Sequence, residues 1–142
     1  MDGKMEDLKL FFKTRDRYAR HSGIELVELS KGGATTRMKI EESHLNGVDI
    51  VHGGAVFTLA DFAFAAACNS YGTIAVALQA NISFLQPATR GEILIARARE
   101  VSKHPKIGVY SIDVTKETGE LIARFQGTAY RKAEQLPVIN RV

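Results

Sequence analysis

The stretch NGVDIVHGGAVFTLADFAFAAAC, residues 46–68, decides how this chain folds. After Asp49 nearly every residue is apolar or small, alanine is abundant and proline is absent, which predicts a helix from Gly54 to about Ser70. Because this helix is apolar on nearly every side, we expect the rest of the chain to enclose it. Asp61 is the main exception, since it places a carboxylate in the middle of the apolar run.

The segments around this helix are predicted to form one further helix and several strands. Apolar residues at helical spacing predict an amphipathic helix over residues 4–20. Residues 23–42 are typical of a β-hairpin with Gly32-Gly33 as its turn, and residues 43–53 of a loop. After the central helix, turn residues separate segments that we expect to be strands, at about 73–86, 91–103, 107–116 and 120–131.

The overall composition is typical of a soluble globular protein, with 142 residues, 45% of them hydrophobic and 25% charged. We expect one domain, residues 1–142. No secretory signal is evident, and the apolar run at residues 62–68 is far too short to span a membrane. The single cysteine suits a reducing compartment, so we expect a cytoplasmic protein. A net charge of +3 without a basic stripe does not indicate nucleic-acid binding.

The order of the predicted elements indicates an α+β fold in which a highly curved antiparallel sheet wraps around the central helix. This order resembles the hotdog fold, and HGGAVFTLADFAFAAACN at residues 52–69 resembles the central-helix motif of PaaI-type (phenylacetic acid degradation) acyl-CoA thioesterases. The resemblance covers about residues 5–132 and implies hydrolysis of an acyl-CoA thioester to a free acid and CoA. It implies no metal or redox cofactor.

Asp61 is the first candidate for chemistry. Its helical neighbours are Phe57, Thr58, Phe64 and Ala65, and only Thr58 offers a hydrogen bond. An ionised carboxylate in such surroundings is costly unless it meets donors or water. A structural Asp could reach solvent or pair with an arginine. The resemblance instead implies that Asp61 attacks the thioester or activates the water that does, and the sequence does not choose between these roles.

Gly53 and Gly54 lie where the helix begins, and the first turn of a helix has unpaired N–H groups. Glycine allows a substrate to approach this backbone closely, so a thioester oxygen could be stabilised there as it becomes negative. A tight loop-to-helix turn would also explain the pair. The resemblance assigns the oxyanion N–H to Gly53.

These two candidates are eight residues apart, which is about 12 Å along a helix axis. An Asp side chain cannot span this distance, so one helix does not bring Gly53 and Asp61 to one carbonyl. A two-fold dimer can, because the helix start of one chain can face the Asp of its partner. The resemblance agrees, and we expect a homodimer with shared sites, assembled further as a dimer of dimers.

Several polar residues are supporting candidates. His52 could orient the carbonyl or its water, and Asn46 could position the nucleophile, although a loop-capping His and an Asn-Gly turn explain them equally well. Gln79, Asn81 and Ser83 alternate on one strand face, which is either solvated or part of a site or subunit interface. The family often has Ser or Thr near position 79, and a Gln departs from that pattern.

For substrate binding, the candidates are Gly54, Thr58, Gln79 and Arg90. The phosphates of CoA favour Lys and Arg, and the basic residues at strand ends or turns are Arg90, Lys103, Lys106 and Arg131, each of which could also be an ordinary surface charge. The four histidines and one cysteine have no metal-ligand spacing. Cys68 lies in the apolar helix and is not expected to act as a nucleophile.

Two other functions remain open at this point. The same fold occurs in non-catalytic acyl-CoA binders or sensors, and in hydratases and dehydratases, which need an acid–base pair that the sequence does not supply. The acyl group is also open. Phe57, Phe64 and Tyr71 would suit an aromatic or medium-chain acyl group, but they would serve equally well in the core.

Overall fold

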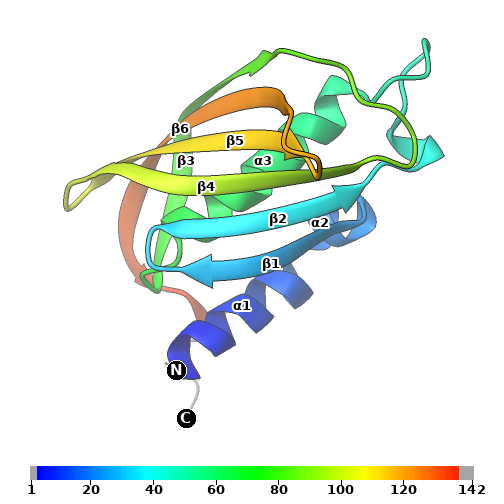
Figure 1. The fold of residues 1–142 in the computed structure, drawn as a ribbon. Helices are drawn as coiled ribbons and strands as arrows, with labels where there is room; N and C mark the ends of the chain where they lie inside the picture. The colour runs from blue at the N-terminus through cyan, green and yellow to red at the C-terminus, as the bar shows by residue number, and fades with distance from the viewer. Residues whose placement is uncertain (1–2, 138–142) are drawn as a thin grey trace.

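A computed structural model describes residues 3–137 of the chain, and in it six strands form one curved antiparallel sheet around a central helix (Figure 1). The sheet order is β1-β2-β4-β5-β6-β3, and each neighbouring pair is antiparallel. This confirms the fold expected from the sequence. The elements are α1 (Gly3–Arg15), α2 (Arg17–His21), β1 (Ile24–Ser30), β2 (Gly33–Lys39), η1 (Glu42–His44), α3 (Gly53–Cys68), β3 (Thr73–Phe84), β4 (Ile93–Lys103), β5 (Ile107–Lys116) and β6 (Leu121–Gln135).

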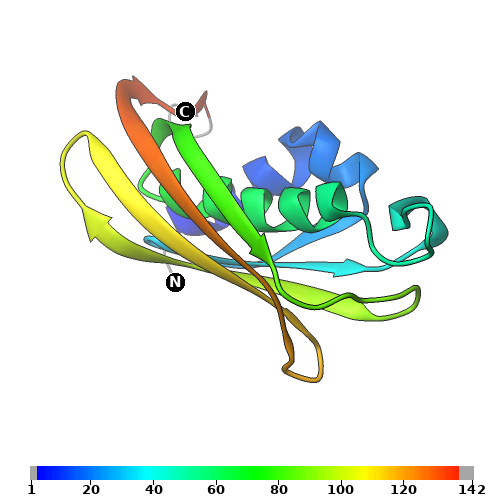
Figure 2. The same cartoon turned by 90° about the horizontal axis from the view of Figure 1, so that it is seen from above.

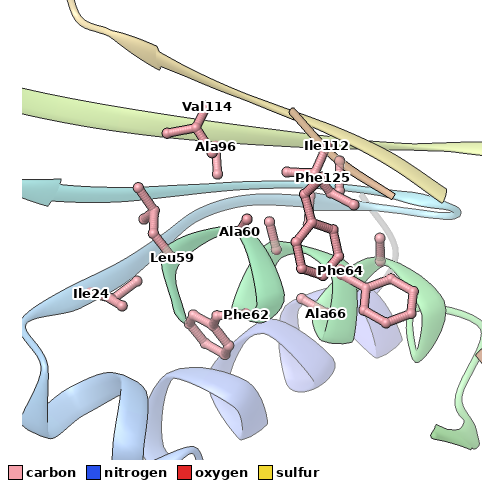
Figure 3. Close-up of a cluster of buried hydrophobic side chains, with 14 of the residues drawn as sticks. Ile24, Leu59, Ala60, Phe62, Phe64, Ala66, Ala96, Ile112, Val114 and Phe125 are labelled. Carbon is pink, nitrogen blue, oxygen red and sulfur yellow. The ribbon is translucent and has the colours of Figure 1, made fainter. Parts of the chain in front are cut away.

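Helix α3 lies along the concave side of the sheet, with α1 and α2 beyond it (Figure 2). Its apolar residues pack against inward-facing side chains from several strands (Figure 3). Leu59, Ala60, Ala63 and Ala66 are fully buried, as the apolar composition of the helix predicts. The helix therefore forms the centre of the core.

On β6, Gly127 lies directly against the ring of Phe64 on α3. A Cβ atom at this position would lie 2.7 Å from the ring of Phe64, a distance that side chains do not tolerate. The Phe64 ring in turn packs against Tyr110 and Phe125, with ring centroids 5.8 Å and 5.7 Å away. The missing side chain at Gly127 thus makes room for the aromatic cluster.

Polar groups hold α3 in place along its length. The buried Thr36 hydroxyl of β2 donates to the Leu59 carbonyl at 2.9 Å. Beyond the end of the helix, Asn69 exchanges hydrogen bonds with the backbone of Ala75, and the Ser70 hydroxyl accepts from the Gly32 N–H at 2.7 Å. These bonds fix both the axial position and the end of the helix.

The single helix expected over residues 4–20 is wrong in one respect, because it is broken at Asp16 into α1 and α2. The Asp16 side chain accepts a hydrogen bond from the Ala19 N–H at 3.1 Å and caps α2. An Asp that can cap a new helix competes with continuation of the old one. Leu8 and Phe12 of α1 are buried as the spacing predicted.

Three smaller expectations also change. The hairpin turn is Lys31-Gly32 rather than Gly32-Gly33, because Ser30 pairs with Gly33 and Gly32 has the positive φ of 77°. Strand β6 continues to Gln135. Helix α3 is not enclosed all round, since a stripe at Gly54, Thr58, Asp61 and Ala65 is not buried. Within residues 3–137, no helix is both long and apolar enough to cross a membrane.

We expect Gly127→Ala to lower the free energy of unfolding by about 1–3 kcal/mol, because the new methyl group overpacks the Phe64 ring. Urea titration with a fluorescence or circular-dichroism readout measures this. The control is Gly47→Ala, where a Cβ meets no atom within 4 Å. An equal loss of unfolding free energy in the two variants would show that the space between Gly127 and the Phe64 ring accommodates a methyl group.

Candidate functional site

The first turn of α3 leaves one backbone donor free. The Gly54 N–H donates to the His52 ring Nδ1 at 2.8 Å, and the N–H groups of Ala55 and Val56 donate to the His52 carbonyl at 2.9 and 3.2 Å. The Gly53 N–H has no acceptor within the described residues. It is therefore the one donor of this turn that is available to a bound oxygen, in addition to the positive end of the helix dipole.

His52 is the N-cap of α3 rather than a free side chain. Because its Nδ1 accepts the Gly54 N–H, a neutral ring carries its proton on Nε2. A Cβ at Gly54 would lie 3.0 Å from Nδ1, so glycine at this position permits the cap. His52 thus engages the Gly54 N–H and leaves that of Gly53 open.

Asn46 shapes the loop that leads into α3. Its side-chain oxygen accepts from the Val48 and Ile50 N–H groups at 3.0 and 3.3 Å, and Asp49 has a positive φ of 63°. Asn46 therefore stabilises the turn at Asn46-Gly47. Its side-chain NH₂ group makes no hydrogen bond in the described chain. Asn46 and Gly53 also line one cavity of about 480 Å³, together with Ile50, Val51, Val56, Phe84, Leu85, Gln86, Pro87 and Ile122.

Asp61 is half-buried, and its side chain has no hydrogen bond or ion pair among residues 3–137. The Thr58 hydroxyl, the one donor expected beside it, donates instead to the Gly54 carbonyl at 2.8 Å. Burial raises the pKa of the Asp61 carboxyl, and the nearby Asp16 carboxylate raises it further. Within the described part of the chain, the site therefore contains a carboxylate without a stabilising partner.

Gly53 and Asp61 do not meet within the chain. They are separated by eight residues of continuous α3, or about 12 Å along its axis. Asp61 lies on the uncovered stripe of α3, which also contains Gly54, Thr58 and Ala65, so its carboxylate can be reached from outside the chain. The described chain therefore presents the two groups as separate halves of a site.

The remaining predicted site residues are dispersed. Gln79 is exposed where the β3–β6 pairing slips after Ala77, and it does not line the Gly53 cavity. Asn81 and Ser83 face away from α3, because Ile82 between them packs on the core. Arg90 is exposed in the segment between β3 and β4. Two residues earlier, the Ala88 carbonyl accepts a hydrogen bond from the Val51 N–H, and this bond joins the segment to the loop before α3.

Other chemistries find less support in the geometry. Burial raises the pKa of the Cys68 thiol to about 12, which disfavours a thiolate. No cluster of metal-ligating side chains occurs among the described residues.

Sequence reasoning missed two parts of the site. Asp16 comes close enough to Asp61 to affect its titration, and nothing in the expected continuous helix pointed to this. Phe84 lies against Gly53, where a Cβ would be 3.2 Å from its ring. The available signal in the sequence was a pair of adjacent apolar residues, Phe84 and Leu85, near the end of the expected strand and just before Gln86-Pro87.

Comparison with known proteins identifies relatives of this chain. Residues 49–123 match the family described as the thioesterase superfamily. Acyl-coenzyme A thioesterase PaaI of Escherichia coli is 38% identical over 82% of this chain and 83% of its own length. Human acyl-coenzyme A thioesterase 13 is 32% identical over 88% of this chain and 91% of its own length. A putative esterase of Archaeoglobus fulgidus is 35% identical over 94% of this chain and 86% of its own length.

Solved structures show the same fold. The E. coli PaaI protein from the phenylacetic acid degradation operon superposes with a TM-score of 0.90 at 34% identity, and the match covers 94% of this chain and 96% of that one. A Streptococcus mutans protein bound to acetyl CoA superposes with a TM-score of 0.76 at 26% identity, and the match covers 80% of this chain and 91% of that one.

The raised pKa of Asp61 has a consequence for stability. An acid whose pKa is higher in the folded than in the unfolded state lowers the free energy of unfolding at pH values above its titration. We therefore expect Asp61→Asn to raise the melting temperature at pH 7. The difference from wild type should shrink as the pH falls through the range in which the carboxyl protonates. Thermal unfolding between pH 4 and 8 measures both effects.

The control is Asp113→Asn, because Asp113 forms an ion pair with Arg124 at 2.9 Å and its replacement should not stabilise the chain. If Asp61→Asn is no more stable than wild type at pH 7, the carboxylate has a donor that this structure does not reveal.

Proposed function

The chain belongs to the thioesterase superfamily, and from this we propose that it hydrolyses an acyl-CoA thioester to a free acid and CoA. The observation that carries the proposal is a pair of groups on α3 that have no partner among residues 3–137, the N–H of Gly53 and the carboxylate of Asp61. The names of the relatives support the substrate, since two of them are acyl-CoA thioesterases and a third is bound to acetyl CoA.

The chemistry requires a negative charge to be stabilised and a nucleophile to be activated. The thioester carbonyl would enter the cavity with its oxygen on the Gly53 N–H, which stabilises the oxyanion that forms on attack. Asp61 would either remove a proton from the attacking water or attack the carbonyl itself, and both routes need its ionised form. On the general-base route, the tetrahedral intermediate collapses, expels the CoA thiolate and leaves the free acid. On the nucleophilic route, collapse expels the thiolate and leaves an acyl–Asp61 anhydride, which water then hydrolyses to the free acid and the regenerated carboxylate.

The two groups would meet between chains. Strand β3 is an edge of the sheet, and its exposed apolar side chains include Val76, Leu78 and Phe84. An uncovered apolar edge beside an uncovered stripe of α3 favours association. We infer that the chain acts as a single hotdog domain in a two-fold dimer, in which Gly53 of one chain faces Asp61 of the other. His52 and Asn46 would hold the loop and helix start on the Gly53 side.

The rival function is an acyl-CoA binder or sensor that does not turn over its ligand. A binder needs no partnerless carboxylate, and burial makes Asp61 costly to keep. This favours the enzyme. Release of free thiol from an acyl-CoA panel separates the two functions and identifies the acyl group.

We expect Asp61→Asn to lower the hydrolysis rate by about 10²–10⁴-fold, because it preserves the shape of the side chain and removes the base or nucleophile. Thiol release under saturating acyl-CoA measures this, and circular dichroism confirms that the variant is folded. A rate within a few-fold of wild type would rule out a catalytic role for Asp61.

A matched control is Asp16→Asn, since Asn can still cap α2 while it removes the charge that raises the pKa of Asp61. This variant should remain active. The acid limb of its pH–rate profile should move to lower pH, because Asp61 then ionises more readily. An unchanged limb would show that the two carboxylates are not coupled.

A shared site can be tested by mixing two inactive variants, Asp61→Asn and Gly53→Val. Neither homodimer should turn over. In a mixed dimer, one site contains both damaged groups and the other contains both intact groups. Half of the dimers from an equal mixture are mixed and each has one good site, so about a quarter of the wild-type rate should return. Native mass spectrometry verifies that mixed dimers form, and no recovery in their presence would refute the shared site.

A further inference from the structure

The connection from β3 to β4 forms one wall of the Gly53 cavity. Residues 85–92, which we call the wall segment, contain no helix or strand (Figure 1). Leu85, Gln86 and Pro87 of this segment line the cavity. Because the segment has no ladder of hydrogen bonds along it, its position depends on the few bonds that hold it. Those bonds therefore determine the shape of the cavity.

Backbone hydrogen bonds hold the half of the wall segment that lines the cavity. The N–H groups of Leu85 and Gln86 donate to the Ile122 carbonyl at 2.8 and 3.2 Å, which joins this half to the start of β6. The carbonyl of the buried Ala88 accepts from the Val51 N–H at 2.8 Å, which joins it to the loop before α3. Both partners, Ile122 and Val51, also line the cavity.

The side chain of Glu92 holds the turn that follows Ala88. Its Oε1 accepts the Thr89 N–H at 2.8 Å and the Thr89 hydroxyl at 3.2 Å, and its Oε2 lies 3.0 Å from the Nζ of Lys116. The Thr89 N–H and, to a smaller extent, Lys116 hold the pKa of the Glu92 carboxyl below its usual range, so the group is ionised at neutral pH. Because Lys116 is the last residue of β5, the carboxylate ties this turn to the sheet.

The ion pair of Glu92 and Lys116 joins two anchored parts of the fold. The Glu92 carbonyl accepts the Ile40 N–H at 2.9 Å, and the Lys116 N–H donates to the Glu120 carbonyl at 2.8 Å, which closes the turn that leads to Ile122. The Lys116 side chain is only 17% exposed. A surface pair between two flexible side chains contributes little, but this one fixes the wall segment relative to the start of β6.

We propose that Glu92 is a positioning residue for the hydrolysis, which keeps the wall segment closed over the cavity beside Gly53. The identity of the group bound in the cavity rests on the proposed function. Glu92 does not line the cavity itself and would act through Gln86 and Pro87. A wall that leaves its place for part of the time lowers the fraction of molecules competent to bind, and the apparent dissociation constant rises by the inverse of that fraction.

The test compares Glu92→Ala with wild type, using whichever of phenylacetyl-CoA and octanoyl-CoA is turned over faster. We expect KM to rise about three- to tenfold and kcat to stay within about twofold, since the wall affects binding and does not touch Asp61. Glu92→Gln should recover part of the loss in KM, because its amide oxygen can still accept from Thr89. Circular dichroism verifies that each variant is folded.

The matched control is Glu120→Ala, which removes a carboxylate 3.9 Å from the same Lys116 Nζ but outside the wall segment. It should leave KM and kcat within about twofold of wild type. Hydrogen exchange gives a second readout that needs no turnover. The Val51 amide, which donates to Ala88, should exchange faster in Glu92→Ala and at the wild-type rate in Glu120→Ala.

Binding is also measured without hydrolysis, by calorimetric titration of the same acyl-CoA into Asp61→Asn. Adding Glu92→Ala to this variant should raise Kd by the same factor as KM. An unchanged Kd and KM, a fall in kcat beyond about twofold, or an equal effect in Glu120→Ala overturns the proposal. If wild type binds the acyl-CoA but releases no thiol, the proposed function is wrong, and a raised Kd with faster Val51 exchange still supports the role of Glu92. If wild type does not bind it, both are wrong.

Discussion

Helix α3 packs the ring of Phe64 against the bare backbone of Gly127, and this contact brings the helix closer to the sheet than a side chain would allow. The helix is too apolar to lie on a surface, so the sheet has to curve around it. The position of the helix then determines where the groups of the candidate site lie. Its first turn holds, in a cavity, an N–H group that has no acceptor among residues 3–137, and its uncovered stripe presents a carboxylate.

The sequence predicted those parts of the fold that depend on periodicity and composition. The central helix and the strands were visible because their hydrophobic patterns extend over many residues. The break at Asp16 was not, because the apolar spacing continues through it and the break depends on a single capping bond. The hairpin turn was displaced by one residue, because two adjacent glycines can both serve in a turn and only the pairing of Ser30 with Gly33 decides between them.

The candidate site was predictable as a set of residues but not as a geometry. The motif around Gly53 and Asp61 indicated the groups, and the rise of a helix indicated that one chain holds them apart. The resemblance implied the Gly53 N–H, but the reason that this N–H is available could not be read from the sequence, since it depends on the His52 ring accepting from Gly54. The Asp16 carboxylate beside Asp61 and the gathering of Lys103 and Arg131 over one tyrosine are tertiary contacts between distant segments, and no local pattern encodes them.

The edge strand β3 also affects how variants of this protein behave in a cell. A long strand with unpaired backbone groups and apolar side chains is a template for uncontrolled pairing when nothing covers it. In the dimer that we propose, a substitution that weakens the contact over β3 would then remove protein as aggregate before any defect in chemistry could be measured. Genetic screens would record such positions as essential for activity although they contact no substrate. Abundance therefore has to be measured alongside turnover before a residue near β3 is assigned a chemical role.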